Sequence, residues 1–167
     1  IAVKGAAEGI SNESSAAAQY LWRVTTIESP PPGGLGIQNP SLKIDPTGKA
    51  HVAYLRKDDR VLRYATATLT PQGPWIAESV ATLSLSSLNG NSLALDSTNK
   101  AHIGFVPGDA SSNLMYTTNA GGTWLTPIRA TTEYCPSSSL AMAPDGTAHF
   151  GCGANSITDA TKRYLKH

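Results

Sequence analysis

The chain has 167 residues, with 13 Lys and Arg against 12 Asp and Glu and a formal net charge of +1. This length suits one domain with its own core. The balanced charge excludes the clustered basic surface of a nucleic-acid-binding protein. No apolar run approaches the roughly 18 residues of a membrane-spanning helix, so we expect no membrane span. The 15 Gly and 11 Pro favour short elements joined by turns, which is typical of an all-β protein.

Residues 1–18 are expected to form a polar N-terminal arm that belongs to no repeated unit. They begin with Ile and lack the charged start and apolar core of a secretory signal. The next stretch, QYLWRVTTIES at 19–29, carries Trp22 and Ile27 in the spacing that recurs farther along the chain at Trp75 and Val80. We therefore expect it to be a strand of the same kind as the one around those later residues.

Three similar strings follow: NPSLKIDPTGKAHVAY at 39–54, GNSLALDSTNKAHIGF at 90–105 and SSSLAMAPDGTAHFGC at 137–152. Each reads Ser-Leu, a turn and then Ala-His before an apolar residue, which predicts a β-hairpin. Their shared leucines, Leu42, Leu93 and Leu140, recur at intervals near 50 residues. Periods of this length point to propeller blades or similar arrays rather than to shorter solenoid repeats.

Further strands complete each repeat. A third strand is expected over 61–67, 114–119 and 162–166, and a fourth, opened by a tryptophan, over 74–83 and 123–132. Four short antiparallel strands per period make one blade of a β-propeller. The predicted layout is an outer strand at 19–29, blade one at 39–83, blade two at 90–132, and strands one to three of blade three at 137–167.

The two ends of this layout are complementary, because the third blade lacks a fourth strand and the strand at 19–29 lacks a blade. Propellers commonly have four to eight blades, so three do not close a ring. Either two chains form a six-bladed homodimer in which each N-terminal strand completes the partner's third blade, or the chain is part of a longer propeller. We favour the homodimer.

The stretch TTNAGGTW at 117–124 stands between the third and fourth strands of the second repeat. It resembles a degenerate Asp-box of the sialidase type, as in bacterial neuraminidase repeats, through Thr117, Asn119, Gly121, Thr123 and Trp124. The resemblance implies a β-propeller in which the side chain at the Asp position caps the turn amides and the Trp packs between strands. It implies a structural role for these five residues and no catalytic one.

A sialidase-like glycoside hydrolase or lyase is the enzymatic alternative that this resemblance raises. Members of that family resemble one another further in an arginine triad, a Tyr with a partnering Glu, and an acidic Asp. Arg56, Arg63 and Arg163 could converge, but Arg129 sits in the reversed order Pro-Ile-Arg, and Glu78 and Glu133 lie in or after outer strands. We therefore predict no catalytic residue.

His51, His102 and His149 occupy the same place in successive repeats, so we expect them to lie a blade apart, too far to share one metal ion. We expect each to make a structural hydrogen bond, with a neighbouring turn or with the repeated Ser41, Ser92 and Ser139. Asp45, Asp96 and Asp145 are expected to cap turns. No metal and no cofactor is predicted.

Binding residues are expected where the repeats differ, in loops at one rim of the sheets. These loops cover 55–60, 106–113 and 153–160, together with the links between blades. Their polar and aromatic side chains form the predicted ligand-binding set, which is Arg56, Lys57, Asp58, Arg60, Asp109, Asn113, Tyr134, Asn155 and Asp159.

Cys135 and Cys152 flank the third hairpin. A turn near Asp145 brings the second cysteine close to the first, so a disulfide is possible; two buried free thiols are the alternative. The disulfide would favour a secreted, periplasmic or cell-surface location.

The sequence therefore predicts a non-catalytic binding module, a lectin-like or protein-binding propeller that takes a glycan or protein ligand through its rim loops. A hydrolase or lyase of the sialidase type and a structural piece of a larger propeller are the alternatives. Fold alone does not decide among these functions.

Overall fold

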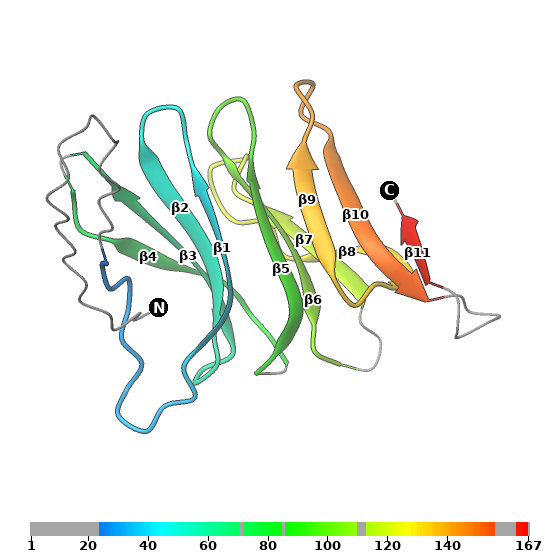
Figure 1. The fold of residues 1–167 in the computed structure, drawn as a ribbon, viewed down its shortest axis with the longest axis horizontal. Coiled ribbons are helices and arrows are strands. Elements are labelled where there is room, and N and C mark those ends of the chain that lie inside the picture. Colours follow the sequence, from blue (N-terminus) through cyan, green and yellow to red (C-terminus); the bar gives the residue numbers. More distant parts are fainter. Residues whose placement is uncertain (1–23, 71, 85, 110–112, 156–162, 167) are drawn as a thin grey trace, which may run out of the picture.

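The computed structural model describes residues 24–70, 72–84, 86–109, 113–155 and 163–166. Within these residues the chain forms only β-strands and connecting turns, arranged as three antiparallel sheets side by side (Figure 1). No helix in this described part is long and apolar enough to cross a membrane. The all-β class predicted from the sequence is confirmed.

Each sheet follows the chain order of its strands. The first contains β1 (Ile37–Ile44), β2 (Lys49–Arg56), β3 (Val61–Thr68) and β4 (Ile76–Thr82). The second contains β5 (Leu88–Leu95), β6 (Ala101–Pro107), β7 (Asn113–Thr118) and β8 (Ile128–Tyr134). The third has three strands, β9 (Ser138–Met142), β10 (Ala148–Asn155) and β11 (Arg163–Lys166).

The predicted hairpins and third strands are therefore present, with ends shifted by a few residues. The clearest shift is at β8, which begins at Ile128 although a strand was expected from residue 123. Pro127 directly before it has no N–H to give to a strand ladder, which delays the pairing. The described sheets do not close on one another, so the propeller and its number of blades stay predictions.

The first strands of the sheets are neighbours, with β5 packed between β1 and β9 (Figure 1). Repeated serines join them. The backbone N–H of Leu93 donates to Ser41 Oγ at 3.0 Å, and the N–H of Leu140 donates to Ser92 Oγ at 2.8 Å. The expectation that these serines bond the repeated histidines is wrong, because their hydroxyls accept from the next sheet instead.

The buried core lies between neighbouring sheets. At each contact between two sheets, here called a joint, the side chains that meet are matched in size. Ala53 of the first sheet and Ile103 of the second share one buried cluster. At the next joint Gly104 occupies the place of Ala53, and Phe150 of the third sheet occupies the place of Ile103. A Cβ on Gly104 would lie 2.7 Å from Phe150 Cε1, so only Gly leaves room for this ring.

The segment before β1 packs on the outward face of the first sheet. Residues 24–29 of the predicted strand 19–29 are not in a strand. Ile27 packs instead against a buried cluster of Val52, Tyr54 and Ala65. The remainder of that predicted strand and the predicted arm at 1–18 lie outside the described residues, and exchange of the strand between chains stays a prediction.

Candidate functional site

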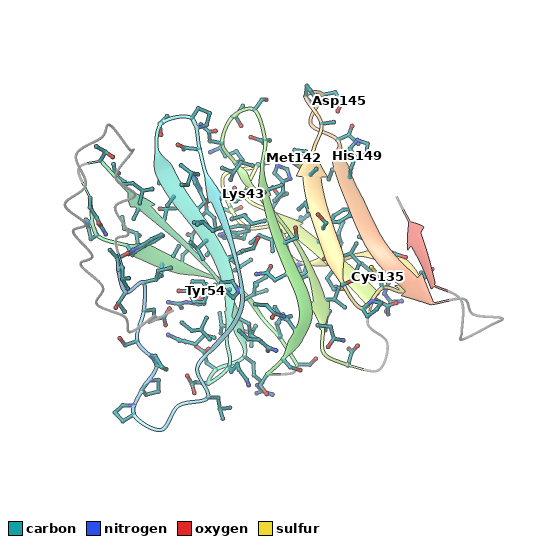
Figure 2. The ribbon with its side chains drawn as sticks, in the orientation of Figure 1. Lys43, Tyr54, Cys135, Met142, Asp145 and His149 are labelled. Carbon is teal, nitrogen blue, oxygen red and sulfur yellow. The ribbon has the colours of Figure 1, made fainter. Side chains whose placement is uncertain are left out.

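An open hollow of about 410 Å³ lies where the first strands of the three sheets approach their hairpin turns. Figure 2 labels Lys43 and Met142, which contribute to it from the first and third sheets. Its lining combines polar residues, such as Lys43 and Asn99, with apolar residues, such as Leu95 and Met142. The lining covers residues 43–46, 94–97, 99 and 140–142. All three repeats therefore contribute to one surface.

Two carboxylates at the edge of the hollow are engaged in their own turns. Asp45 Oδ1 accepts hydrogen bonds from the backbone N–H groups of Thr47 and Lys49 and from the Thr47 hydroxyl. The Thr47 hydroxyl and these backbone donors hold the pKa of Asp45 well below its usual range. The expected turn-capping role is therefore what the geometry shows at this position.

Asp96 repeats this arrangement one sheet along. Its Oδ1 accepts from the N–H and hydroxyl of Thr98 and from the N–H of Lys100. Partial burial opposes ionisation, but the bonds from Lys100 and Thr98 outweigh it and lower the pKa of Asp96 to about 2. Asp145 accepts from the N–H of Thr147 at 2.9 Å.

The repeated histidines connect these aspartates to a tyrosine in the third strand of the same sheet. His51 Nε2 lies 3.2 Å from Asp45 Oδ2, and its Nδ1 lies 2.5 Å from the Tyr64 hydroxyl. Burial lowers the pKa of His51, which favours the neutral ring. Because an ionised carboxylate only accepts, Nε2–H donates to Asp45 and Nδ1 accepts from Tyr64.

His102 makes the same chain with Asp96 Oδ2 at 3.2 Å and the Tyr116 hydroxyl at 2.6 Å. These two histidines thus have structural partners within their own sheets, as expected. One partner is the aspartate of the neighbouring turn, which was one of the two options expected, and the other is a tyrosine rather than a serine. No group of three or more His, Cys, Asp or Glu side chains in the described part of the chain is arranged to hold a metal ion.

The predicted rim residues lie at the other end of the strands, around the β2–β3 turn. Arg56 donates to Glu28 and to Asp59, and Tyr54 donates to Glu28 Oε2 at 2.6 Å. Partial burial opposes ionisation of Glu28, but the bonds from Tyr54 and Arg56 keep its pKa below the usual value. Arg56 therefore fastens the segment before β1 to the first sheet.

The other rim residues are less concentrated than predicted. Asp58 Oδ1 accepts from the N–H of Leu35 at 2.5 Å, and Arg60 Nη1 donates to Ser84 O at 3.1 Å. The backbone N–H of Lys57 donates to Gly36 O. Asn113 pairs with Tyr134 between β7 and β8, Asn155 ends β10, and Asp109 follows β6. Asp159 lies outside the described residues.

The Asp-box stretch forms the turn between β7 and β8, but its bonds differ from those that the resemblance implies. Asn119 Oδ1 accepts from the N–H of Ala101 at 2.8 Å, outside its own turn. Thr118 Oγ1 accepts from the turn N–H of Ala120, and Thr117 Oγ1 donates to Leu125 O. Gly122 has a φ of +93°, which favours glycine, and Trp124 packs edge-on against Tyr64.

Of the two alternatives for the cysteines, the disulfide is not formed, and the structure shows two buried free thiols. Cys135 and Cys152 are free thiols in one buried cluster with Val106 and Leu114. The Cys135 thiol donates to Ser137 O at 3.3 Å, and burial together with the neighbouring Cys152 raises its pKa to about 12. The exterior location inferred from a disulfide stays a proposal and gains no support from these thiols.

The hollow was not predicted from the sequence. The repeated Asp45 and Asp96 marked the hairpin turns that border it, but they were interpreted as caps alone. The mixed polar and apolar lining comes from residues that differ among repeats, such as Lys43, Ala94 and Ala141 at one aligned position. That position was the signal available, because divergence within a repeated scaffold favours binding surfaces.

Known structures resemble this fold at low sequence identity. No protein-family model matches the sequence, and no curated protein matches it. A fucose lectin from Kordia zhangzhouensis, solved with methyl-fucoside, is similar with a TM-score of 0.50 and 15% identity, over 77% of this chain and 97% of the lectin. AofleA from Arthrobotrys oligospora is similar with a TM-score of 0.57 and 11% identity, over 90% of this chain. The chain spans 48% of AofleA, about half its length.

Proposed function

We propose that the protein is a non-catalytic carbohydrate-binding module and that the hollow across the three hairpins is its binding surface. The observation that carries this proposal is the composition of the hollow, which the polar residues Lys43 and Asn99 line together with the apolar residues Leu95 and Met142. Sugars offer hydroxyl groups and apolar C–H faces together, and concave sites of mixed polarity suit them. The fold likeness to a fucose lectin supports the same class of ligand.

The carboxylates of the hollow argue against the hydrolase alternative. A glycosidase needs one carboxylic acid with a raised pKa to protonate the leaving oxygen. Asp45 and Asp96 instead have lowered pKa values, and turn donors occupy their oxygens. They therefore suit the role of turn caps better than that of a proton donor.

The test is sugar binding by the whole chain, first to methyl-fucoside by calorimetry and then to a glycan array. Ala141 lies exposed on β9 in the lining of the hollow. Ala141→Trp fills the hollow and is expected to weaken binding at least about tenfold, which corresponds to about 1.4 kcal/mol.

Ala130→Trp is the matched control, because Ala130 is also exposed on a strand but lies on β8, outside the hollow. It should leave binding unchanged. Lys57→Ala tests the rim. If Lys57→Ala lost sugar binding and Ala141→Trp kept it, the site would lie in the predicted rim loops. Absence of binding to any sugar by the wild-type chain would overturn the proposal.

A further inference from the structure

The segment before β1 stands against the first sheet as β4 stands against the second sheet. Trp124 Nε1 of the second sheet donates to Glu78 Oε1 on β4 at 3.0 Å. Trp75 Nε1 of the first sheet donates in the same way to Thr25 Oγ1 at 3.1 Å. The two acceptors correspond, because each lies three residues after a Trp in the aligned sequence, Thr25 after Trp22 and Glu78 after Trp75.

The apolar contacts repeat this correspondence. Val80 of β4 packs against the same core cluster as Trp124, and Ile27 packs against the same cluster as Trp75. Ile27 and Val80 both lie five residues after the aligned Trp. Residues 24–28 therefore occupy the place of a fourth strand in a sheet that would precede the first one.

The inner part of this face carries a leucine that is buried in both other repeats. Leu93 and Leu140 are 0% and 5% exposed because each packs against the sheet before it. Leu42 holds the same register position and is 57% exposed. The neighbouring Ile44 is 58% exposed. In the first sheet, the leucine that the other two sheets bury against a neighbouring sheet is therefore left exposed.

The third sheet offers the complementary face. It has three strands, and β11 lies at its edge within the described residues. Gly104 faces the next sheet, and Phe150 occupies the space beside it. At the equivalent Gly151, no atom of the described residues lies within 4 Å of a Cβ built on the backbone. Ser139 holds the position of Ser41 and Ser92, whose hydroxyls accept from the following sheet.

We propose that the face formed by Leu42, Ile44 and residues 24–28 binds the third sheet of a second copy of this chain. In this arrangement β11 of the second copy pairs with residues 24–28, and its Ser139 hydroxyl accepts from the N–H of Leu42. The contact is head-to-tail, and two such contacts close a ring of six sheets and cover both open edges. It does not depend on the proposed carbohydrate binding.

The test is the solution mass of the full chain by light scattering across a wide range of concentrations. The wild-type chain is expected at twice 17.4 kDa. Leu42→Asp places a charge in the buried contact and is expected to weaken association at least about a hundredfold, giving a mass of 17.4 kDa. Because Leu42 is exposed in the single chain, this variant should keep its fold, as circular dichroism would show.

Ile76→Asp is the matched control, since Ile76 is 70% exposed on β4 and alternates with Trp75 and Ala77, which pack toward the proposed contact. It should leave the dimer intact. Gly151→Phe probes the opposite face and is expected to abolish the dimer as Leu42→Asp does. A one-to-one mixture of the two disrupted variants should regain association. In the mixed dimer, the unaltered first sheet of the Gly151→Phe chain meets the unaltered third sheet of the Leu42→Asp chain.

Several results would overturn the proposal: a wild-type mass of 17.4 kDa at every concentration, a dimer that survives both Leu42→Asp and Gly151→Phe, or a mixture of the two variants that stays monomeric. A mass above two copies that Leu42→Asp reduces to one copy would support the same contact in an open assembly.

Discussion

The hairpin ends and the joints between sheets are stabilised in different ways. At a hairpin end, Asp45, His51 and Tyr64 form a chain of polar contacts inside one sheet, and the turn donors of Thr47 complete it. At a joint, the match between Gly104 and Phe150 is one of size. The difference shows that the hairpin ends depend on charge and hydrogen bonds, whereas the joints combine the serine hydrogen bonds with a match in side-chain size.

The largest expected effect comes from breaking the polar chain of the first sheet. His51→Ala removes a buried ring and leaves Asp45 Oδ2 and the Tyr64 hydroxyl without their partner. Unpaired buried polar groups are costly, so the free energy of unfolding should fall by about 3 kcal/mol. Urea unfolding followed by tryptophan fluorescence measures the change.

His149→Ala is the comparison variant, because it makes the same change at the equivalent position of the third sheet, where the ring is half-buried. Its effect should be clearly smaller. Equal losses at both positions would mean that the deeper burial of the ring in the first sheet does not determine the size of the loss.

The size match between sheets gives a smaller effect. Gly104→Ala puts a Cβ 2.7 Å from Phe150 Cε1, so the ring must shift and the free energy of unfolding should fall by about 1–2 kcal/mol. Phe150→Leu in the same chain should recover part of the loss, and a double-mutant cycle measures that coupling.

Gly151→Ala is the matched control for this joint, because a Cβ there has open space. It should be close to neutral even in a dimer, since Ala53 at the equivalent position of the first sheet accommodates Ile103. A loss as large as that of Gly104→Ala would show that the substitution acts on the strand itself rather than on the joint.

Much of this fold could be predicted because the information repeats along the chain. The Ser-Leu and Ala-His strings predicted three hairpins with their turns in the places that the structure shows, since period-two alternation and turn residues act locally. The tyrosine partners of the histidines could not be predicted, because Tyr64 and Tyr116 come from the third strand and their distance from the histidines depends on the pairing register. The start of β8 was predicted too early, because Trp124 indicated a strand from residue 123, whereas Pro127 delays the pairing until Ile128.

The candidate site was harder to predict than the fold. Divergent loops were expected to bind, yet Arg56 proves to be held by Glu28 and Asp59. Glu28 precedes β1 by several residues, so no local pattern relates it to the β2–β3 turn. The hollow arises only when three hairpins lie side by side, and that depends on contacts between repeats rather than within one.

The smallest expected effect is a loss of folding stability that appears only at acid pH. It arises at a hairpin end, from Asp45, and not at the joints between sheets. The Thr47 hydroxyl, together with backbone donors, depresses the pKa of Asp45 in the folded chain below its unfolded value of about 3.9. A group of this kind contributes stability that is present above the unfolded pKa and is lost as pH falls through the folded pKa. The wild-type chain should therefore lose stability progressively below about pH 4.

Asp45→Asn should flatten that acid loss while lowering stability at neutral pH, since an amide accepts these bonds less strongly than a carboxylate. Asp145→Asn, at a turn whose carboxylate accepts from the backbone N–H of Thr147, should flatten it less. Thermal unfolding at pH values from neutral to acid measures both slopes. Asp45 has more hydrogen-bond donors to lose than Asp145. If Asp145→Asn nevertheless flattened the curve more than Asp45→Asn, the polar chain of the first sheet would not be the source of the acid sensitivity.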